Sequence, residues 1–203
     1  ANSSTYRTCY NSLGCIASCL DVTRQDHDDW CVGHEVGHNN QGVINLEGGT
    51  EVSNNLFSNF CRFLTGNVTS SGEALSNTMF EYAQGIPFAK RGGLMRMYYQ
   101  LYLYYHLGQR NTSFFPELFK ELRRDPLTDH YKNTNNSSLK FVRKVCEIAQ
   151  EDLTDFFEAW GFFKTCNNLK ISDYGNYTMT VKISDINRTK ATIAKYARKN
   201  REI

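Results

Sequence analysis

The stretch His34-Glu35-Val36-Gly37-His38 is predicted to lie on a helix. Residues four apart on a helix share one face, so the two imidazoles can bind one zinc ion together. Glu35 directly follows His34, so its carboxylate can reach a water on that metal without binding the metal. This is the geometry that a metallopeptidase needs, because zinc lowers the pKa of the water and the glutamate takes its proton during attack on a carbonyl.

A catalytic zinc ion uses three protein ligands and keeps one position for water, so a third ligand must follow the two histidines. The downstream candidates are Glu47 and Glu51. Glu47 lies in a glycine-rich loop, whereas Glu51 opens a predicted helix, residues 50–66, that Thr50 can cap. A rigid element holds a carboxylate against a metal better than a loop does, so we favour Glu51.

Three amide side chains lie where they can orient these ligands. Asn54 and Asn55 are three and four residues after Glu51, and Gln41 is three residues after His38. Each amide can hydrogen-bond a metal-binding side chain and fix its orientation, or it can be an ordinary surface amide. The motif itself has a plainer interpretation too, as a helix with two partly buried histidines.

Composition places the function in a local site. The chain has 203 residues, is 40% hydrophobic and 22% charged, and carries a net charge of +2, which is typical of one globular domain. So small a net charge points neither to nucleic acid nor to an acidic membrane, and no stretch approaches the roughly 20 apolar residues of a membrane span. The basic residues 188–201 are interpreted as a solvated helix face, since no aromatic platform interrupts them. We therefore expect no nucleic-acid partner and no membrane span.

Hydrophobic spacing predicts a mostly α fold with minor β structure (α+β), in a single unit covering residues 1–203. The only strand indicated by alternation is residues 177–183. The opening residues are predicted to be largely irregular. Helices are expected at residues 12–20, 32–41, 50–66, 73–84, 93–107, 116–124, 138–150, 153–163 and 186–198, with Gly42 just past the end of the second.

Several aromatic residues and histidines could also serve a site. A phenol from the tyrosine-rich segment 98–105 could stabilise an oxyanion, but buried core is the favoured interpretation, and we assign no catalytic role to it or to His106 or His130. Trp160 is expected in the core because four phenylalanines flank it. Trp30, just before the motif, is the better candidate to line a cleft, where a sugar could stack on its ring.

Three stretches together resemble the enhancin-like zinc metallopeptidases, the family numbered sixty among metallopeptidases: His34-Glu35-Val36-Gly37-His38, Asn39-Asn40-Gln41 and Thr50-Glu51-Val52-Ser53-Asn54-Asn55-Leu56. The family signature is H-E-x-G-H followed within about 8 to 28 residues by a ligand glutamate. Here twelve residues separate His38 from Glu51. The likeness extends over residues 5–163 and is strongest over residues 30–60.

This resemblance implies a zincin-like catalytic domain that binds Zn²⁺ through His34, His38 and Glu51, with Glu35 as general base. Members of the family are mostly secreted or surface proteins, and many attack mucin-like glycoproteins by reading an O-linked sugar near the cleaved bond. The resemblance therefore implies a secreted or cell-surface endopeptidase with a glycoprotein or glycopeptide substrate.

The region before His34 departs from the zincin pattern. Zincin peptidases generally align substrate along an edge strand of a sheet that precedes the zinc-binding helix. Only 33 residues precede His34, and they do not have the pattern of a sheet of several strands. Two alternatives stay open: a catalytic domain truncated at its N-terminal sheet, and a non-catalytic glycan- or protein-binding module that retains the zinc site.

Overall fold

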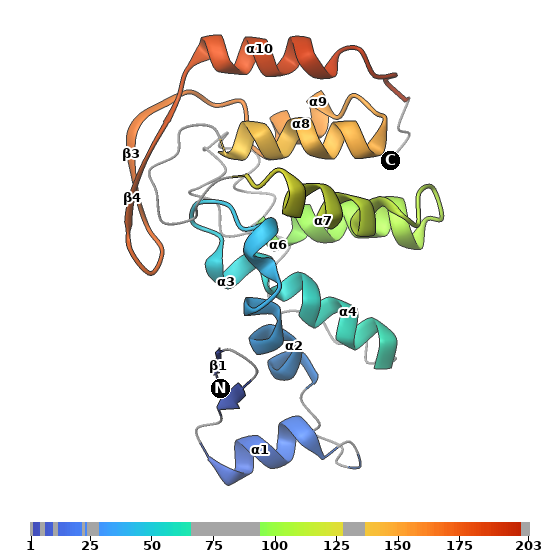
Figure 1. Ribbon diagram of the computed structural model, residues 1–203, viewed down its shortest axis with the longest axis vertical. Coiled ribbons are helices and arrows are strands. Elements are labelled where there is room, and N and C mark those ends of the chain that lie inside the picture. The colour runs from blue at the N-terminus through green and yellow to red at the C-terminus, as the bar shows by residue number, and fades with distance from the viewer. Residues whose placement is uncertain are drawn as a thin grey trace.

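Helices dominate the described part of the chain, which confirms the mostly α prediction (Figure 1). The computed structural model describes residues 2–4, 7–9, 12–21, 23, 29–65, 94–127 and 137–199. The helices are α1 (Leu13–Leu20), α2 (Asp29–His38), η1 (Gln41–Val43), α3 (Thr50–Ser53), α4 (Asn55–Thr65), α6 (Leu94–Leu101), η3 (Tyr102–Leu107), α7 (Phe114–Arg124), α8 (Ser137–Ala149), α9 (Thr154–Ala159) and α10 (Ile183–Ile193). Two antiparallel hairpins complete the fold: β1 (Asn2–Ser4) with β2 (Arg7–Cys9), and β3 (Cys166–Ser172) with β4 (Asn176–Val181).

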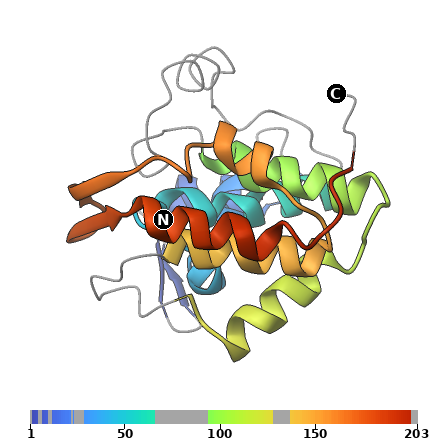
Figure 2. The ribbon, with the colours of Figure 1, turned by 90° about the horizontal axis from the view of Figure 1, so that it is seen from above.

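The elements are stacked along the long axis of the molecule. Helix α1 and the first hairpin lie at one end, α2 packs on α4, and α3 and α4 both contact α6 (Figure 1). Helix α8 lies between α7 and α10, and α10 forms the opposite end, where it covers α8 (Figures 1 and 2). The β3–β4 hairpin runs along one side, back toward α3 (Figure 1). Segments far apart in sequence thus meet near the middle of the stack.

Aromatic side chains form the core of the C-terminal half. Phe157 is fully buried and meets Phe141 and Phe162 edge-on, with ring centroids 6.2 and 5.0 Å apart. Trp160 is buried beside them, and its indole N–H donates to Gln100 Oε1 at 2.9 Å, which confirms the predicted core role.

The tyrosine-rich segment is core as predicted, since Tyr98, Tyr102 and Tyr105 are all buried. The Tyr98 hydroxyl donates to the carbonyl oxygen of Ile44 at 2.7 Å, and burial, with the charge of Glu47 second, raises the pKa of that phenol. This bond ties the core to the loop just before α3.

The single helix predicted over residues 50–66 is wrong. It is divided into α3 and α4 at Asn54, and the residue that caps α3 is Gly49 rather than Thr50. Thr50 is instead the first helical residue, because its backbone N–H and its hydroxyl both donate to Asp173 Oδ2, at 3.2 and 2.8 Å. A tertiary contact with the distant hairpin therefore replaces the local cap.

The second hairpin was only half predicted. Strand β4 is present, and Met179 and Val181 are buried as the alternation predicts, but Ile183 opens α10 and is exposed. Strand β3 was missed because its pairing is irregular between Cys166 and Leu169, which removes the clean alternation of a strand. The first hairpin was missed too, since its strands have three residues each.

Other helices differ from prediction mainly at their ends. The helix predicted over residues 93–107 finishes as the π-helix η3, while α9 is shorter than predicted, and α10 begins and ends earlier. The helix predicted over residues 73–84 lies outside the described residues. Within the described ranges, no helix is both long and apolar enough to span a bilayer.

Candidate metal centre

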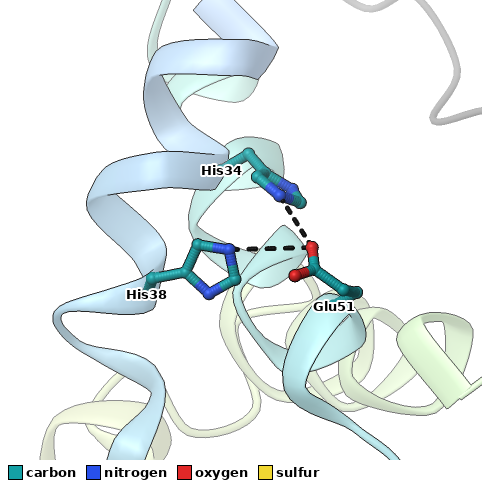
Figure 3. A group of neighbouring side chains, drawn as sticks. All are labelled: His34, His38 and Glu51. Carbon is teal, nitrogen blue, oxygen red and sulfur yellow. Dashed lines mark ion pairs between the residues drawn. The ribbon is translucent and has the colours of Figure 1, made fainter. Parts of the chain in front are cut away.

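Three donor atoms from two helices converge on one point. Helix α2 carries His34 and His38 on one face, and α3 presents Glu51 to that face (Figure 3). Glu51 Oε2 lies 3.0 Å from His34 Nε2 and 3.6 Å from His38 Nε2, and one ligand atom from each residue lies within 4.8 Å of the others. The three residues that the sequence selected are therefore brought together.

The donor set fits a zinc ion. Tetrahedral zinc with bonds of about 2.0 to 2.2 Å places its ligand atoms about 3.3 to 3.6 Å apart, close to the two His–Glu separations. Two imidazoles and one carboxylate are also a usual catalytic set with a free fourth position. The rejected candidate Glu47 lies elsewhere, since it accepts a hydrogen bond from Ser137 at the start of α8.

Each histidine is held at its other ring nitrogen by an amide. His34 Nδ1 lies 2.7 Å from Asn55 Oδ1, and His38 Nδ1 lies 2.8 Å from Gln41 Nε2. The orienting roles considered for Asn55 and Gln41 thus match the geometry. An imidazole that binds metal through Nε2 carries its proton on Nδ1, so the Asn55 oxygen is placed to accept a hydrogen bond from that N–H.

The Gln41 side chain can likewise accept a hydrogen bond from the Nδ1–H of His38. Its Oε1 accepts from the Ser53 hydroxyl at 2.7 Å, and Ser53 also lies 3.2 Å from the carbonyl oxygen of Gly49. A half-turn of the Gln41 amide directs its oxygen to His38 Nδ1 and its nitrogen to Ser53, which then donates to Gly49. The buried chain from His38 to Gly49 is thus satisfied in either tautomer of His38.

Asn54, at the junction between α3 and α4, is fully buried against the histidines. Its Nδ2 lies 3.1 Å from His38 Nε2 and 3.3 Å from the carbonyl oxygen of His34. Its Oδ1 is buried and has no hydrogen-bond partner among the described residues. Asn54 therefore contacts Nε2 of His38, the nitrogen that faces the metal position, whereas Asn55 and Gln41 contact the Nδ1 atoms on the far side of the two rings.

Two glycines allow the helices to approach closely enough for this geometry. A Cβ at Gly37 would lie 2.5 Å from the backbone oxygen of Asn54, and one at Gly33 would lie 2.6 Å from Cα of Ser58. Since Gly33 and Gly37 are one helical turn apart, they form a flat stripe on α2. The spacing of these two glycines in the sequence is a signal from which a close helix–helix contact can be predicted.

Glu35 lies on α2 between the two histidines and is only 7% exposed, whereas the next residue, Val36, is 43% exposed. Its carboxylate thus sits on the protected side of the helix. Trp30 is half-buried in the first turn of α2, four and eight residues before the histidines, and so lies along the same face.

Among the described residues, His106 is the one further histidine, and it lies in a different environment. His106 stacks on Tyr102 with centroids 5.1 Å apart, and its Nδ1 lies 3.2 Å from the carbonyl oxygen of Thr112. His130 lies outside the described residues.

A tyrosine that sequence reasoning missed contacts the candidate ligand Glu51. The hydroxyl of Tyr174, in the turn between β3 and β4, donates to Glu51 Oε1 at 2.5 Å. That hydrogen bond and the charge of Glu51 raise the pKa of the phenol above 10.0, and the charges of Asp173 and Glu35 act in the same direction. The phenol therefore stays protonated near neutral pH. No local pattern connects Tyr174 with Glu51, so only the fold could identify this contact.

Comparisons with known proteins relate this chain to metallopeptidases. Residues 1–161 match the profile of the family described as Peptidase M60, enhancin and enhancin-like. A metallopeptidase solved in complex with Tn antigen is 33% identical with a TM-score of 0.79, over 90% of this chain and 35% of that chain. A metallopeptidase from Bacteroides thetaiotaomicron is also 33% identical with a TM-score of 0.79, over 89% of this chain and 32% of that one. The chain thus spans about a third of their length, and no curated protein sequence matches it.

Proposed function

Because this chain belongs to the peptidase M60 family of enhancin and enhancin-like proteins, we propose that it is a zinc-dependent endopeptidase that hydrolyses peptide bonds in mucin-like O-glycosylated proteins. The observation that carries the proposal is the convergence of His34, His38 and Glu51, with buried Glu35 on the same helix. The structural likeness to metallopeptidases supports it.

In this proposal His34, His38 and Glu51 hold the zinc ion. When bound, zinc supplies Lewis-acid chemistry: it lowers the pKa of water and polarises a carbonyl oxygen. Glu35 accepts a proton from the attacking water as the new C–O bond forms at the scissile carbonyl. Glu35 then gives this proton to the leaving amine as the C–N bond breaks, which regenerates its carboxylate. If another group protonates the amine instead, Glu35 returns its proton to solvent.

The proposed preference for glycosylated substrates rests on the similarity to one metallopeptidase and on the position of Trp30. One of the similar metallopeptidases was solved with Tn antigen, which supports a glycopeptide substrate here. Trp30 lies along the histidine face of α2, where its ring could stack on a sugar. We also propose that the protein acts outside the cell or at its surface, and that residues 1–203 form one catalytic domain or the larger part of one.

Two variants test this function. His38→Ala should lose the roughly one zinc ion per chain expected in the wild type, as measured by elemental mass spectrometry. Glu35→Gln should keep the zinc but reduce cleavage of a mucin-type glycopeptide by about 10²- to 10⁴-fold, because the base is removed and the ligands stay. A wild-type protein that takes up no zinc after metal addition would refute the proposal.

Cleavage and sugar-binding assays on the wild type and Glu35→Gln separate the enzyme from a binding module. A glycan- or protein-binding module that retains the zinc site would bind sugar equally well with or without Glu35→Gln, and would show no turnover in either form. Zinc content alone does not distinguish them, since both bind metal.

A further inference from the structure

Two hydrogen-bonded contacts fasten the tip of the β3–β4 hairpin to helix α3. Asp173 Oδ2 accepts from the backbone N–H and the hydroxyl of Thr50, and the next residue, Tyr174, donates to the Oε1 atom of Glu51. Adjacent residues of the tip thus bind adjacent residues of the helix that carries the candidate ligand. The tip is therefore fixed at the metal centre rather than free beside it.

The two oxygens of Glu51 have different partners. Oε2 faces the Nε2 atoms of both histidines, at 3.0 and 3.6 Å, while Oε1 accepts a hydrogen bond from the Tyr174 hydroxyl. A hydrogen bond to one carboxylate oxygen fixes the rotation of the group and leaves the other oxygen for a metal. The phenol can only donate here, since Glu51 when ionised has no proton to offer.

With this contact, every candidate ligand has a polar partner that fixes its orientation. Asn55 holds His34, Gln41 holds His38, and Tyr174 holds Glu51. Asn55 and Gln41 belong to the segment that carries the ligands, whereas Tyr174 lies beyond the family match, which ends at residue 161. The hairpin thus supplies the partner of the third candidate ligand, which the motif segment does not supply.

The backbone of Tyr174 has the left-handed conformation that is usual in a tight hairpin turn. Its φ is 52°, in the left-handed region that favours glycine, although Gly175 is the next residue. Its side chain is 81% exposed, so burial of the ring does not explain the conformation. The hydrogen bond to Glu51 gives this exposed side chain a defined partner.

We propose that Tyr174 is a positioning residue for Glu51, which holds the carboxylate so that a single oxygen is presented to the zinc ion. This inference rests on the proposed zinc site. It also assigns the β3–β4 hairpin to the active centre, as a strap that docks on α3 through Asp173 and orients the third ligand through Tyr174.

Tyr174→Phe is the direct test, because it removes only an exposed hydroxyl. Zinc affinity, measured by competition with a chromogenic chelator, should fall by about tenfold to a hundredfold, which is typical for loss of a group that orients a ligand. The melting temperature of the zinc-free protein should not change. Tyr177→Phe, the same change in the same hairpin, is the matched control and should bind zinc like the wild type.

Cobalt substitution gives a readout that a structural role would not move. The visible absorption of the Co²⁺-loaded protein should differ between wild type and Tyr174→Phe, because the Glu51 carboxylate is released, and should not differ for Tyr177→Phe. Asp173→Ala, which undocks the tip but keeps the phenol, should weaken zinc binding in the same direction.

Three outcomes would overturn the assignment. If the wild type binds zinc and Tyr174→Phe binds it within twofold, Tyr174 does not position Glu51, although the proposed function stands. If zinc affinity and the cobalt spectrum are unchanged while turnover alone falls, the phenol acts on the substrate instead. If the wild type binds no zinc, the proposed function fails and this inference fails with it.

Discussion

The two halves of the molecule are held together by different interactions. In the α2–α4 region, backbone meets backbone at Gly33 and Gly37, and buried polar side chains lie in the contact: Glu35, Gln41, Ser53, Asn54 and Ser58. In the α6–α10 region, interlocking aromatic rings fill the core, among them Phe141, Phe157 and Trp160. The first region therefore depends on close backbone packing and on buried polar contacts. The second depends on the burial of large apolar side chains.

This difference predicts how each region responds to substitution. A core of large rings loses most when volume is removed, because a cavity and the lost apolar burial add together. A contact between glycines loses most when a single carbon is added, because backbone atoms cannot move aside as a flexible side chain can. The following substitutions test this contrast, from the largest expected effect to the smallest.

Phe157→Ala should have the largest effect on stability. Removing this buried ring should lower the free energy of unfolding by about 3–5 kcal/mol, as measured by urea denaturation. Where the variant is still folded, its zinc affinity should stay close to that of the wild type, because no described polar contact of the candidate ligands comes from α9. A selective loss of zinc binding would show that the two regions are not separate.

Gly37→Ala tests the other region, by adding a carbon where Phe157→Ala removes a ring. In an unobstructed helix alanine is favoured over glycine, but here the added carbon would meet the backbone oxygen of Asn54 at 2.5 Å. We expect the free energy of unfolding to fall by about 1–3 kcal/mol, with weaker zinc binding because α2 is pushed away from α3.

Gly42→Ala is the matched control for that variant. A Cβ at this exposed position would have nothing within 4 Å, so stability should change by less than about 0.5 kcal/mol. Equal effects of the two glycine variants in denaturation and zinc titration would argue against the close contact as the cause.

Asn55→Ala should weaken zinc binding with little effect on the fold. The variant removes the acceptor 2.7 Å from His34 Nδ1, so zinc affinity should fall by about tenfold to a hundredfold in a chelator competition. Asn59→Ala, which removes a nearby amide of α4 that donates to the carbonyl oxygen of Asn55, serves for comparison and should bind zinc normally. Equal losses in both variants would show a general effect of disturbing α4.

Asp152→Asn should have a small effect on stability, and one that depends on pH. Burial raises the pKa of Asp152, but hydrogen bonds from Thr154 and Arg198 outweigh it and hold the pKa below 3.8. A lowered pKa contributes stability that is present above pH 4 and is lost as the pH falls through the folded-state value. The variant should therefore be less stable by about 1 kcal/mol at pH 7, and the difference should shrink below pH 4 in denaturation series. A difference that stays constant down to pH 2 would contradict the charge-based explanation.

The sequence predicted the local features of the candidate centre well. His34 and His38 could be placed on one helical face, and Glu51 preferred over Glu47, because helical periodicity and rigidity are local properties. The sequence allows two interpretations of Asn55 and Gln41, and their distances to the histidines favour the orienting one. Helix positions were also predicted, although their ends shifted where tertiary contacts compete, as at Thr50.

Other features depended on partners distant in sequence. Strand β3 lacked alternation because its pairing with β4 is irregular, and the break between α3 and α4 coincides with Asn54, which packs against Gly37. No pattern near Tyr174 indicates a contact with Glu51, since the two residues meet only when the hairpin folds back along the stack of helices (Figure 1).

The sequence by itself determined the helical class and the identities and spacing of the candidate zinc-binding residues. These are properties of composition and of one helical period. The tertiary structure alone decided the separation of α2 from α3 and the partner of each ligand. It also decided the contact of the β3–β4 hairpin with Glu51. These features depend on how closely backbones pack, and that distance is set by side chains from segments that the chain brings together only on folding.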